Sequence, residues 1–226
     1  MRFLFVLAVA ALIAAPAFAQ VTCCYSWEDG GTIFGGYGTN LVDPTNVTGP
    51  QTGLCGGCDG GTYDCPGAYH GDYYLHVAEE PHSGTPQAYI AWITGLAAGD
   101  VVTASFYGYD ITPNASPSLR IWGHYADDVD VMSYYGSASG LYDYTAGNGW
   151  DYIEYEWTFA ATDTSATAIV VEARLYSTPA TSEDRTDYWI DYVCVTAPTT
   201  ACIHFPPPGM NPVEDSTWGR IKELYR

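Results

Sequence analysis

The sequence predicts an all-β protein, a jelly-roll β-sandwich of two antiparallel sheets with a short C-terminal helical tail, and three observations support this fold class. Runs rich in β-branched and aromatic residues recur at short intervals after residue 71. Clusters of Gly, Pro, Asn and Asp separate these runs, as turns between strands require. No run before the tail has its apolar residues at helical spacing. The expected strands cover residues 72–77, 87–93, 101–109, 118–125, 151–159, 168–176 and 187–195.

In two of these strands, 101–109 and 118–125, the residue pattern indicates which side is buried. Side chains alternate between the two faces of a strand. In each strand one alternate set is apolar and is expected to form the core, namely Val102, Ala104, Phe106, Leu119 and Ile121. The opposite set combines aromatic rings with hydrogen-bonding groups. Such a set suits a ligand that is hydroxylated and partly apolar, such as a sugar.

The candidate carbohydrate-binding surface collects the members of this second set. A pyranose has apolar C–H faces on which rings stack and a rim of hydroxyls that polar groups bind. Alternation along residues 168–176 extends the surface, which then holds two of the few arginines in the chain. Packing of these rings against neighbouring strands is the alternative interpretation. The residues expected on this single solvent-exposed face are Tyr107, Tyr109, Arg120, Trp122, His124, Glu172, Arg174 and Tyr176.

The first 19 residues have the pattern of a secretory signal peptide. Arg2 precedes an apolar run, and small residues precede an expected cleavage site before Gln20. The run is too short to span a bilayer. The mature protein is therefore expected to be secreted or held at the cell surface, and its length suits one domain over residues 20–203.

The charge of the expected domain is strongly acidic. The whole chain has 26 acidic residues, 7 Lys and Arg, and a net charge of −19. Three of the acids and four of the bases lie in the leader or the C-terminal tail, so 23 acids remain with Arg120, Arg174 and Arg185. Such a charge repels nucleic acid and anionic membranes, which leaves neutral polymers, calcium and basic proteins as partners.

Seven cysteines in an exported chain indicate disulfides. Cys23 and Cys24 lie near the start of the mature chain, and Cys194 and Cys202 near the end of the domain. A bridge between these two groups would join the first and last strands. A further local bridge is expected among three cysteines of a glycine-rich loop, with a zinc site as the alternative: Cys55, Cys58 and Cys65.

The C-terminal stretch differs from the rest of the chain. Residues 204–213 are rich in proline and are expected to form an extended linker. Residues 214–226 have apolar positions at helical spacing and a terminal cation at Arg226. This tail is interpreted either as a helix that directs surface sorting by cell-surface machinery or as a disordered end.

The order of motifs resembles the CenC-type carbohydrate-binding modules of the galactose-binding-like jelly-roll superfamily. The resemblance covers most of the mature chain, although Tyr192 replaces the second closing aspartate of the family and residues 54–66 form an extra insert. The motifs correspond to an opening aromatic-Glu-Asp-Gly, a Gly-aromatic-Leu-x-Val strand, a Leu-x-x-Gly turn with a Ser-Phe strand, a Trp before a Thr-Phe strand end, and a closing Ile-Asp strand. In this chain they lie at 26–30, 71–77, 95–100, 104–107, 150–159 and 189–195.

The resemblance implies a structural calcium ion. In the family such an ion lies between the opening acid and the closing aspartate, which are Glu28 and Asp191 here. A hard cation of this kind needs several oxygen ligands, which glycine-rich turns can complete through carbonyl groups. The alternative is a solvated loop acid at Glu28 and a strand cap at Asp191.

The predicted function is that of a secreted, non-catalytic carbohydrate-binding module for a polysaccharide or glycan. Two alternatives stay open. One is an extracellular structural or surface-attached matrix protein. The other is a jelly-roll glycoside hydrolase that uses two carboxylates across a cleft, drawn from Glu154, Glu156 and Glu172.

Overall fold

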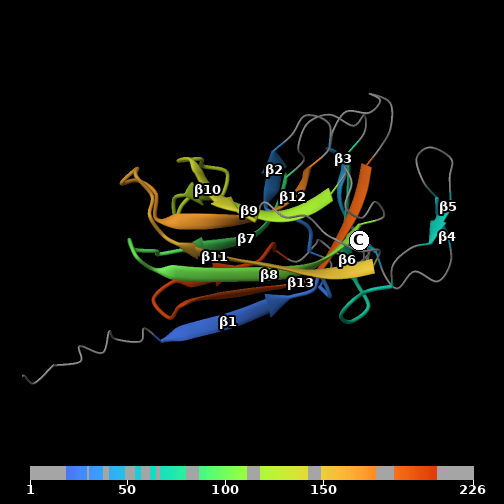
Figure 1. Ribbon diagram of the computed structural model, residues 1–226, viewed down its shortest axis with the longest axis horizontal. Coiled ribbons are helices and arrows are strands. Elements are labelled where there is room, and N and C mark those ends of the chain that lie inside the picture. Colours follow the sequence, from blue (N-terminus) through green and yellow to red (C-terminus); the bar gives the residue numbers. More distant parts are fainter. Residues whose placement is uncertain are drawn as a thin grey trace, which may run out of the picture.

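The computed structural model describes residues 19–29, 31–37, 41–48, 54–56, 62–64, 67–79, 87–110, 118–141, 149–176 and 186–207. These residues form two six-stranded antiparallel sheets and one small hairpin, and this part of the chain contains no helix. Figure 1 shows the two large sheets stacked as layers, with β9 and β7 in one and β8, β13 and β1 in the other. The structure is therefore the antiparallel sandwich that the strand pattern predicts.

The first layer, called the β8 sheet, is built around the two longest paired strands of the fold. Its order is β11 (Gly149–Thr158), β8 (Val101–Asp110), β13 (Thr186–Pro198), β6 (Tyr74–Glu79) and β3 (Leu41–Thr48). Strand β1 (Gln20–Tyr25) pairs with the second half of β13.

The second layer, called the β9 sheet, carries the polar residues of strands β9 and β12. Its order is β10 (Ser137–Gly140), β9 (Ser118–Ala126), β12 (Ala168–Tyr176), β7 (Gln87–Thr94) and β14 (Cys202–His204), and β2 (Gly35–Tyr37) pairs with β7. The hairpin consists of β4 (Leu54–Gly56) and β5 (Thr62–Asp64).

The chain crosses repeatedly between the two layers. Strands β6, β7, β8 and β9 belong alternately to the β8 and β9 sheets, and so do β11, β12, β13 and β14. Strands that follow one another in sequence are thus seldom paired, and β8 lies between β11 and β13. This alternation of layers is the connectivity of a jelly roll, so the predicted fold class is confirmed.

The core lies between the two sheets and contains the apolar sets expected from alternation. Val102, Ala104 and Phe106 from β8 are buried against Leu119 and Ile121 from β9. A side chain at Gly108 would occupy the space that Leu119 fills, so the glycine allows close contact between the layers. The predicted inward faces of both strands are confirmed.

The folded body extends past the domain boundary expected at residue 203. Strand β14 ends at His204, and the ring of Phe205 stacks on Tyr25 with centroids 5.4 Å apart. Pro206 is buried as well. The linker expected over 204–213 therefore begins too early, while the leader up to residue 18 and the tail 214–226 lie outside the described residues. Within the described part, no helix is long and apolar enough to cross a membrane.

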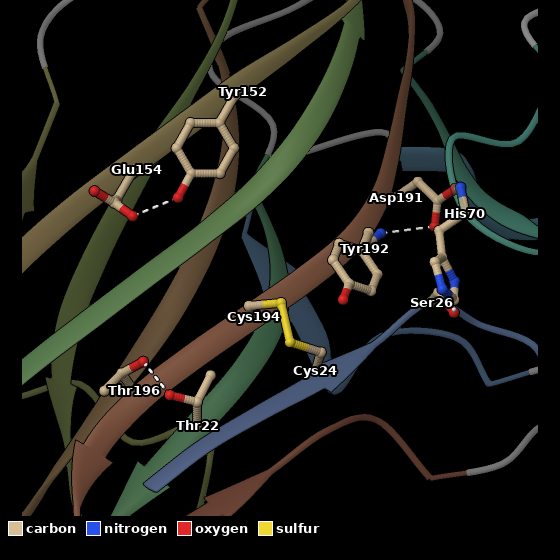
Figure 2. The surroundings of a disulfide bond; sticks show 10 residues. All are labelled: Thr22, Cys24, Ser26, His70, Tyr152, Glu154, Asp191, Tyr192, Cys194 and Thr196. Atoms are coloured by element: carbon tan, nitrogen blue, oxygen red, sulfur yellow. Dashed lines mark hydrogen bonds between the residues drawn. A yellow bond between two sulfur atoms is a disulfide. The ribbon is translucent and has the colours of Figure 1, made fainter. Parts of the chain in front are cut away.

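A disulfide joins the strands at the two ends of the domain. Cys24 on β1 is bonded to Cys194 on β13, its direct partner in the strand register (Figure 2). The expected bridge between the two terminal groups of cysteines is confirmed. Cys23 and Cys202 are free thiols. The local bridge or zinc site expected in the glycine-rich loop lies outside what the structure describes.

Candidate functional site

The structure divides the predicted carbohydrate-binding residues between two opposite surfaces. Tyr107 and Tyr109 project from the outer face of the β8 sheet, whereas the residues of β9 and β12 project from the outer face of the β9 sheet. The expectation of one shared face is wrong, because alternation tells inward from outward but does not tell which layer a strand joins. Tyr176 ends β12, and its side chain is not among those described. The residues on the β9 sheet are Arg120, Trp122, His124, Glu172 and Arg174.

A buried polar network organises the outer face of the β9 sheet. Glu172 is 0 % exposed, and its Oε1 atom lies 2.6 Å from Nδ1 of His124, which is 1 % exposed. Its Oε2 atom accepts hydrogen bonds from Nη2 and Nε of Arg174 at 2.8 and 3.1 Å. Both oxygens of the buried carboxylate are therefore satisfied, as a charge in this position requires.

Trp122 joins the two arginines of this face. The guanidinium carbons of Arg120 and Arg174 lie 4.6 and 4.9 Å from its ring centroid, within the range of cation–π interactions. Its indole N–H donates to Ser137 Oγ at 3.0 Å. The ring is only 8 % exposed. Trp122 therefore fixes the positions of the arginines and is not the open stacking platform that was expected.

The segment from Asp127 to Gly136 covers part of this face. The Asp127 carboxylate accepts hydrogen bonds from the backbone N–H groups of Val129 and Asp130, and these bonds hold the pKa of Asp127 below its usual value. The turn brings Tyr134 over His124, with ring centroids 5.5 Å apart. Tyr89 approaches the same histidine from β7 at 4.8 Å. The imidazole is thus enclosed by two tyrosine rings.

A cavity of ≈ 580 Å³ lies beside this network. Its volume is within the range of small-ligand sites, which combine apolar walls with a few placed polar groups. Two aromatic rings, a thioether, an amide and a guanidinium provide such a lining. A sugar could stack on the rings while its hydroxyls bind the amide and the guanidinium. The lining residues are Gly36, Gln87, Tyr89, Met132, Tyr134 and Arg174.

Sequence reasoning found Arg174 but missed the aromatic walls of this cavity. Strand β7 has a bulge at Ile90, because Tyr89 pairs with Glu172 while Ala91 pairs with Val171. Ile90 and Ala91 are both fully buried, so strict alternation fails along this strand. Tyr134 lies outside any strand, where alternation gives no signal.

The outer face of the β8 sheet carries a row of rings, one from each of four adjacent strands. Trp150, Tyr109, Trp189 and His76 follow one another with centroid distances of 5.5, 5.7 and 5.4 Å. The first two contacts are edge-to-face and the third is stacked, both favourable arrangements for aromatic pairs. Tyr109 is therefore part of a packed aromatic layer, as the alternative interpretation proposed.

A second group of rings lies beside this row. Tyr69 stacks on Tyr107 with centroids 3.5 Å apart, and Tyr152 lies 5.3 Å from Tyr107 on the adjacent strand. Hydrogen bonding to Tyr107 raises the pKa of Tyr69. The indole N–H of Trp150 donates to the carbonyl of Gly67 at 2.9 Å, which fixes the loop that carries Tyr69.

Glu28 and Asp191, the predicted calcium ligands, both bind backbone N–H groups of the loop between Gly67 and Tyr73. Glu28 accepts from Asp72 at 3.0 Å and from Tyr73 at 3.1 Å. Asp191 is fully buried and accepts from His70 at 2.8 Å and from Tyr192 at 2.6 Å (Figure 2). Burial raises the pKa of Asp191 to about 6.

These contacts do not suit a divalent cation. The carboxylate oxygens face N–H donors, whose partial positive charges would repel a metal ion. Among the described residues, no group of three or more His, Cys, Asp or Glu side chains could hold a metal. The two acids instead fasten one loop to β13 and to the start of the domain, and calcium binding by Glu28 and Asp191 stays a prediction.

The candidate catalytic carboxylates do not all lie on one side of the molecule. Glu154 and Glu156 are exposed on the outer face of the β8 sheet, whereas Glu172 is buried on the outer face of the β9 sheet. Glycosidases need two carboxylates about 5 to 9 Å apart on either side of one bond. Stacked sheets are already about 10 Å apart, so Glu172 does not meet this requirement with either of the others.

Several solved structures are similar to this chain at low sequence identity. The CBM22-2 xylan-binding domain of Paenibacillus barcinonensis Xyn10C is 16% identical, with 77% of this chain and 98% of that chain covered and a TM-score of 0.44. The CBM22-1 xylan-binding domain of the same protein is 12% identical, with 74% and 96% covered and a TM-score of 0.37. A cyclase from Fischerella sp. TAU is 9% identical, with 79% and 84% covered and a TM-score of 0.40.

No protein-family model and no curated protein matches the chain. The resemblance to CenC-type modules is therefore not confirmed at the level of the family. A fold by itself does not determine function, so the function is argued from the residues of the site.

Proposed function

We propose that this chain is an exported, non-catalytic carbohydrate-binding module that holds a glycan in the cavity on the outer face of the β9 sheet. One observation carries the proposal: the cavity joins the rings of Tyr89 and Tyr134 to the polar groups of Gln87 and Arg174. Aromatic walls and a few directed polar groups are the elements with which proteins bind a pyranose ring.

The network behind the cavity gives the site a fixed geometry. Two hydrogen bonds to Glu172 hold the guanidinium of Arg174, and His124 holds the second carboxylate oxygen. Rigid polar groups lose little conformational freedom on binding, which favours affinity for a ligand of matching shape. The buried charge is costly to place, so its presence beside the cavity is better explained by binding than by stability.

Export and ligand class are consistent with the covalent structure and the charge. A disulfide between Cys24 and Cys194 is typical of proteins that fold in an oxidising compartment. The net charge of −19 opposes polyanionic ligands and favours a neutral polysaccharide.

Surface sorting by residues 214–226 is part of the proposal, and relocation of a periplasmic reporter fused to this tail would test it.

Binding at the cavity is tested on the purified mature protein with a panel of polysaccharides that includes xylan, cellulose, glucomannan and mixed-linkage β-glucan. Retention on an insoluble polymer and titration calorimetry with soluble oligosaccharides measure affinity. Tyr134→Ala should weaken binding about tenfold, because one stacked ring contributes on the order of 1 kcal/mol. Tyr134→Phe, which keeps the ring, and Val129→Ala, on the same segment but away from the cavity lining, should bind like the unmodified protein.

Three results would overturn the proposal. Absence of retention on every polymer would remove the ligand class. Equal affinity of Tyr134→Ala and the unmodified protein would remove the site. Release of reducing sugar would establish a catalyst instead of a binding module.

Calcium binding is checked separately, because loss of an ion held by Glu28 and Asp191 would lower the melting temperature when EDTA is added.

A further inference from the structure

The aromatic layer on the outer face of the β8 sheet is not needed for the cavity on the opposite side of the molecule. Its rings lie on strands β11, β8, β13 and β6 and on the loop between Gly67 and Tyr73. The core between the sheets is formed by other side chains, those of the inward faces. Neither the cavity nor the core between the sheets therefore accounts for this aromatic layer.

Two rings that contact Tyr107 are open to solvent. Tyr69 is 44 % exposed and Tyr152 is 54 % exposed. The stack of Tyr69 on Tyr107 and the hydrogen bond from Trp150 to the carbonyl of Gly67 fix the first ring. The hydroxyl of Tyr152 donates to the carboxylate of Glu154 on the same strand, which fixes the second. Two aromatic rings are thus held in place and in contact with water.

Charge limits what can stack on these rings. Nucleobases and sugars are the common biological ligands of exposed aromatic platforms. The charged residues described on the outer face of the β8 sheet around Tyr152 are the acids Glu154 and Glu156, and the arginines that the structure describes both lie on the β9 sheet. A nucleic acid would be repelled, whereas carboxylates accept hydrogen bonds from sugar hydroxyls.

We propose that Tyr69, Tyr107 and Tyr152 form a second glycan-binding surface, so that one molecule can bridge two neutral polysaccharide chains from opposite faces of the sandwich. The ligand class is that of the proposed function, but the residues and the face are different. Two sites that point in opposite directions cannot hold one short oligosaccharide together. They can cross-link long chains and increase retention on a polymer surface through avidity.

The test compares stoichiometry and cross-linking in three proteins. The unmodified protein should bind two molecules of a neutral oligosaccharide in calorimetry and make a solution of the long polymer turbid at intermediate protein concentration. The double variant Tyr69→Ala/Tyr152→Ala should bind one and lose the turbidity. Tyr134→Ala should reduce the turbidity, because its cavity site binds about tenfold more weakly, while its other site still depends on Tyr69 and Tyr152.

A matched control separates ring stacking from a change in fold. Tyr69→Phe/Tyr152→Phe keeps both rings and should retain two sites, and circular dichroism should be the same for all variants. A stoichiometry of one in the unmodified protein, with an affinity that Tyr134→Ala lowers and Tyr69→Ala/Tyr152→Ala leaves unchanged, would overturn this proposal and leave the proposed function intact. The same stoichiometry removed by Tyr69→Ala/Tyr152→Ala would instead refute the cavity as the site. Turbidity that persists in the double variant would also overturn the bridging proposal.

Discussion

At the scale of single residues, Glu172 links the stability of the protein to the geometry of the cavity. Its carboxylate is fully buried and is bonded to His124 and Arg174. Removing one partner of a buried charged pair leaves the other uncompensated, which costs about 3–5 kcal/mol. The stability of the protein therefore depends on the charge of Glu172, the same group that holds Arg174 at the cavity.

Glu172→Gln should consequently lower the free energy of unfolding by about 3 kcal/mol or more, measured by urea denaturation. Glycan affinity should fall too, since Arg174 loses the acceptor that orients it. The matched control is Glu156→Gln, which removes the same charge from an exposed position and should change stability by less than about 0.5 kcal/mol. Equal stability of the two variants would contradict the role assigned to the network.

Asp191 gives a second prediction at this scale, concerning pH. Burial raises the pKa of Asp191 to about 6, above its ordinary value of 3.8. The folded state then binds the proton more tightly than the unfolded state, so this group lowers stability as the pH rises from about 4 to about 6. The shift corresponds to about 3 kcal/mol, fully present below pH 4 and lost above pH 6.

Denaturation of Asp191→Asn and of the unmodified protein at pH 4, 5, 6 and 7 measures this contribution. The other carboxylates titrate in both proteins and cancel in the difference. The stability of Asp191→Asn relative to the unmodified protein should therefore be about 3 kcal/mol greater at pH 7 than at pH 4. Parallel stability curves would show that the carboxylate is not buried as described.

Alternation along single strands correctly predicted which residues are buried, but not which residues share one surface of the molecule. The inward positions Phe106 and Ile121 follow from period-two patterning, which each strand carries locally. The sheet to which a strand belongs depends on crossings between layers, and no local pattern encodes them. Tyr107 and Trp122 were therefore correctly expected to face outward but wrongly expected to face the same side.

At the scale of elements, strand β1 is held to the domain by covalent as well as hydrogen bonds. It pairs along its length with β13, and Thr22 bonds Thr196 across the same pair (Figure 2). The bridge from Cys24 closes a separation of 170 residues. In the chain-entropy account, a loop of this size destabilises the unfolded state by roughly 5 kcal/mol.

Cys24→Ser/Cys194→Ser should therefore lower the free energy of unfolding by about 2–5 kcal/mol. Thermal unfolding with and without dithiothreitol measures the effect, since reduction should destabilise the unmodified protein more than the double variant. Cys23→Ser is the matched control, because this neighbouring thiol is free. If Cys23→Ser destabilised as much as the double variant, the pairing of the cysteines would be wrong.

The sequence predicted the elements with a strong period-two signal and overlooked those without one. All seven expected strands are present, as β6, β7, β8, β9, β11, β12 and β13. Strands β10 and β14 have three or four residues and are set by pairing with β9 and β7. Such short edges owe their structure to a partner strand, which a reading of local patterns does not supply.

At the scale of the whole molecule, the acidic charge should affect folding stability and ligand binding at the two outer faces differently. The 23 acids and three arginines of the domain create self-repulsion that salt screens beyond about 10 Å at 0.1 M. A neutral glycan bound through rings and hydroxyls carries no charge that such a field could attract or repel. Folding and binding should therefore respond differently to ionic strength.

Raising sodium chloride from about 10 mM to about 500 mM should increase the melting temperature, because repulsion among the acids weakens. Over the same range the affinity for a neutral oligosaccharide should change less than about twofold, measured by calorimetry at fixed pH. Chloride suits this test better than sulfate, which strengthens burial by exclusion from the surface and would mask the electrostatic effect. An affinity that falls steeply and linearly with the logarithm of the salt concentration would indicate an anionic ligand. In that case Arg120 and Arg174 would be contacts for its charge, and the neutral polysaccharide proposed for both faces would be the wrong class.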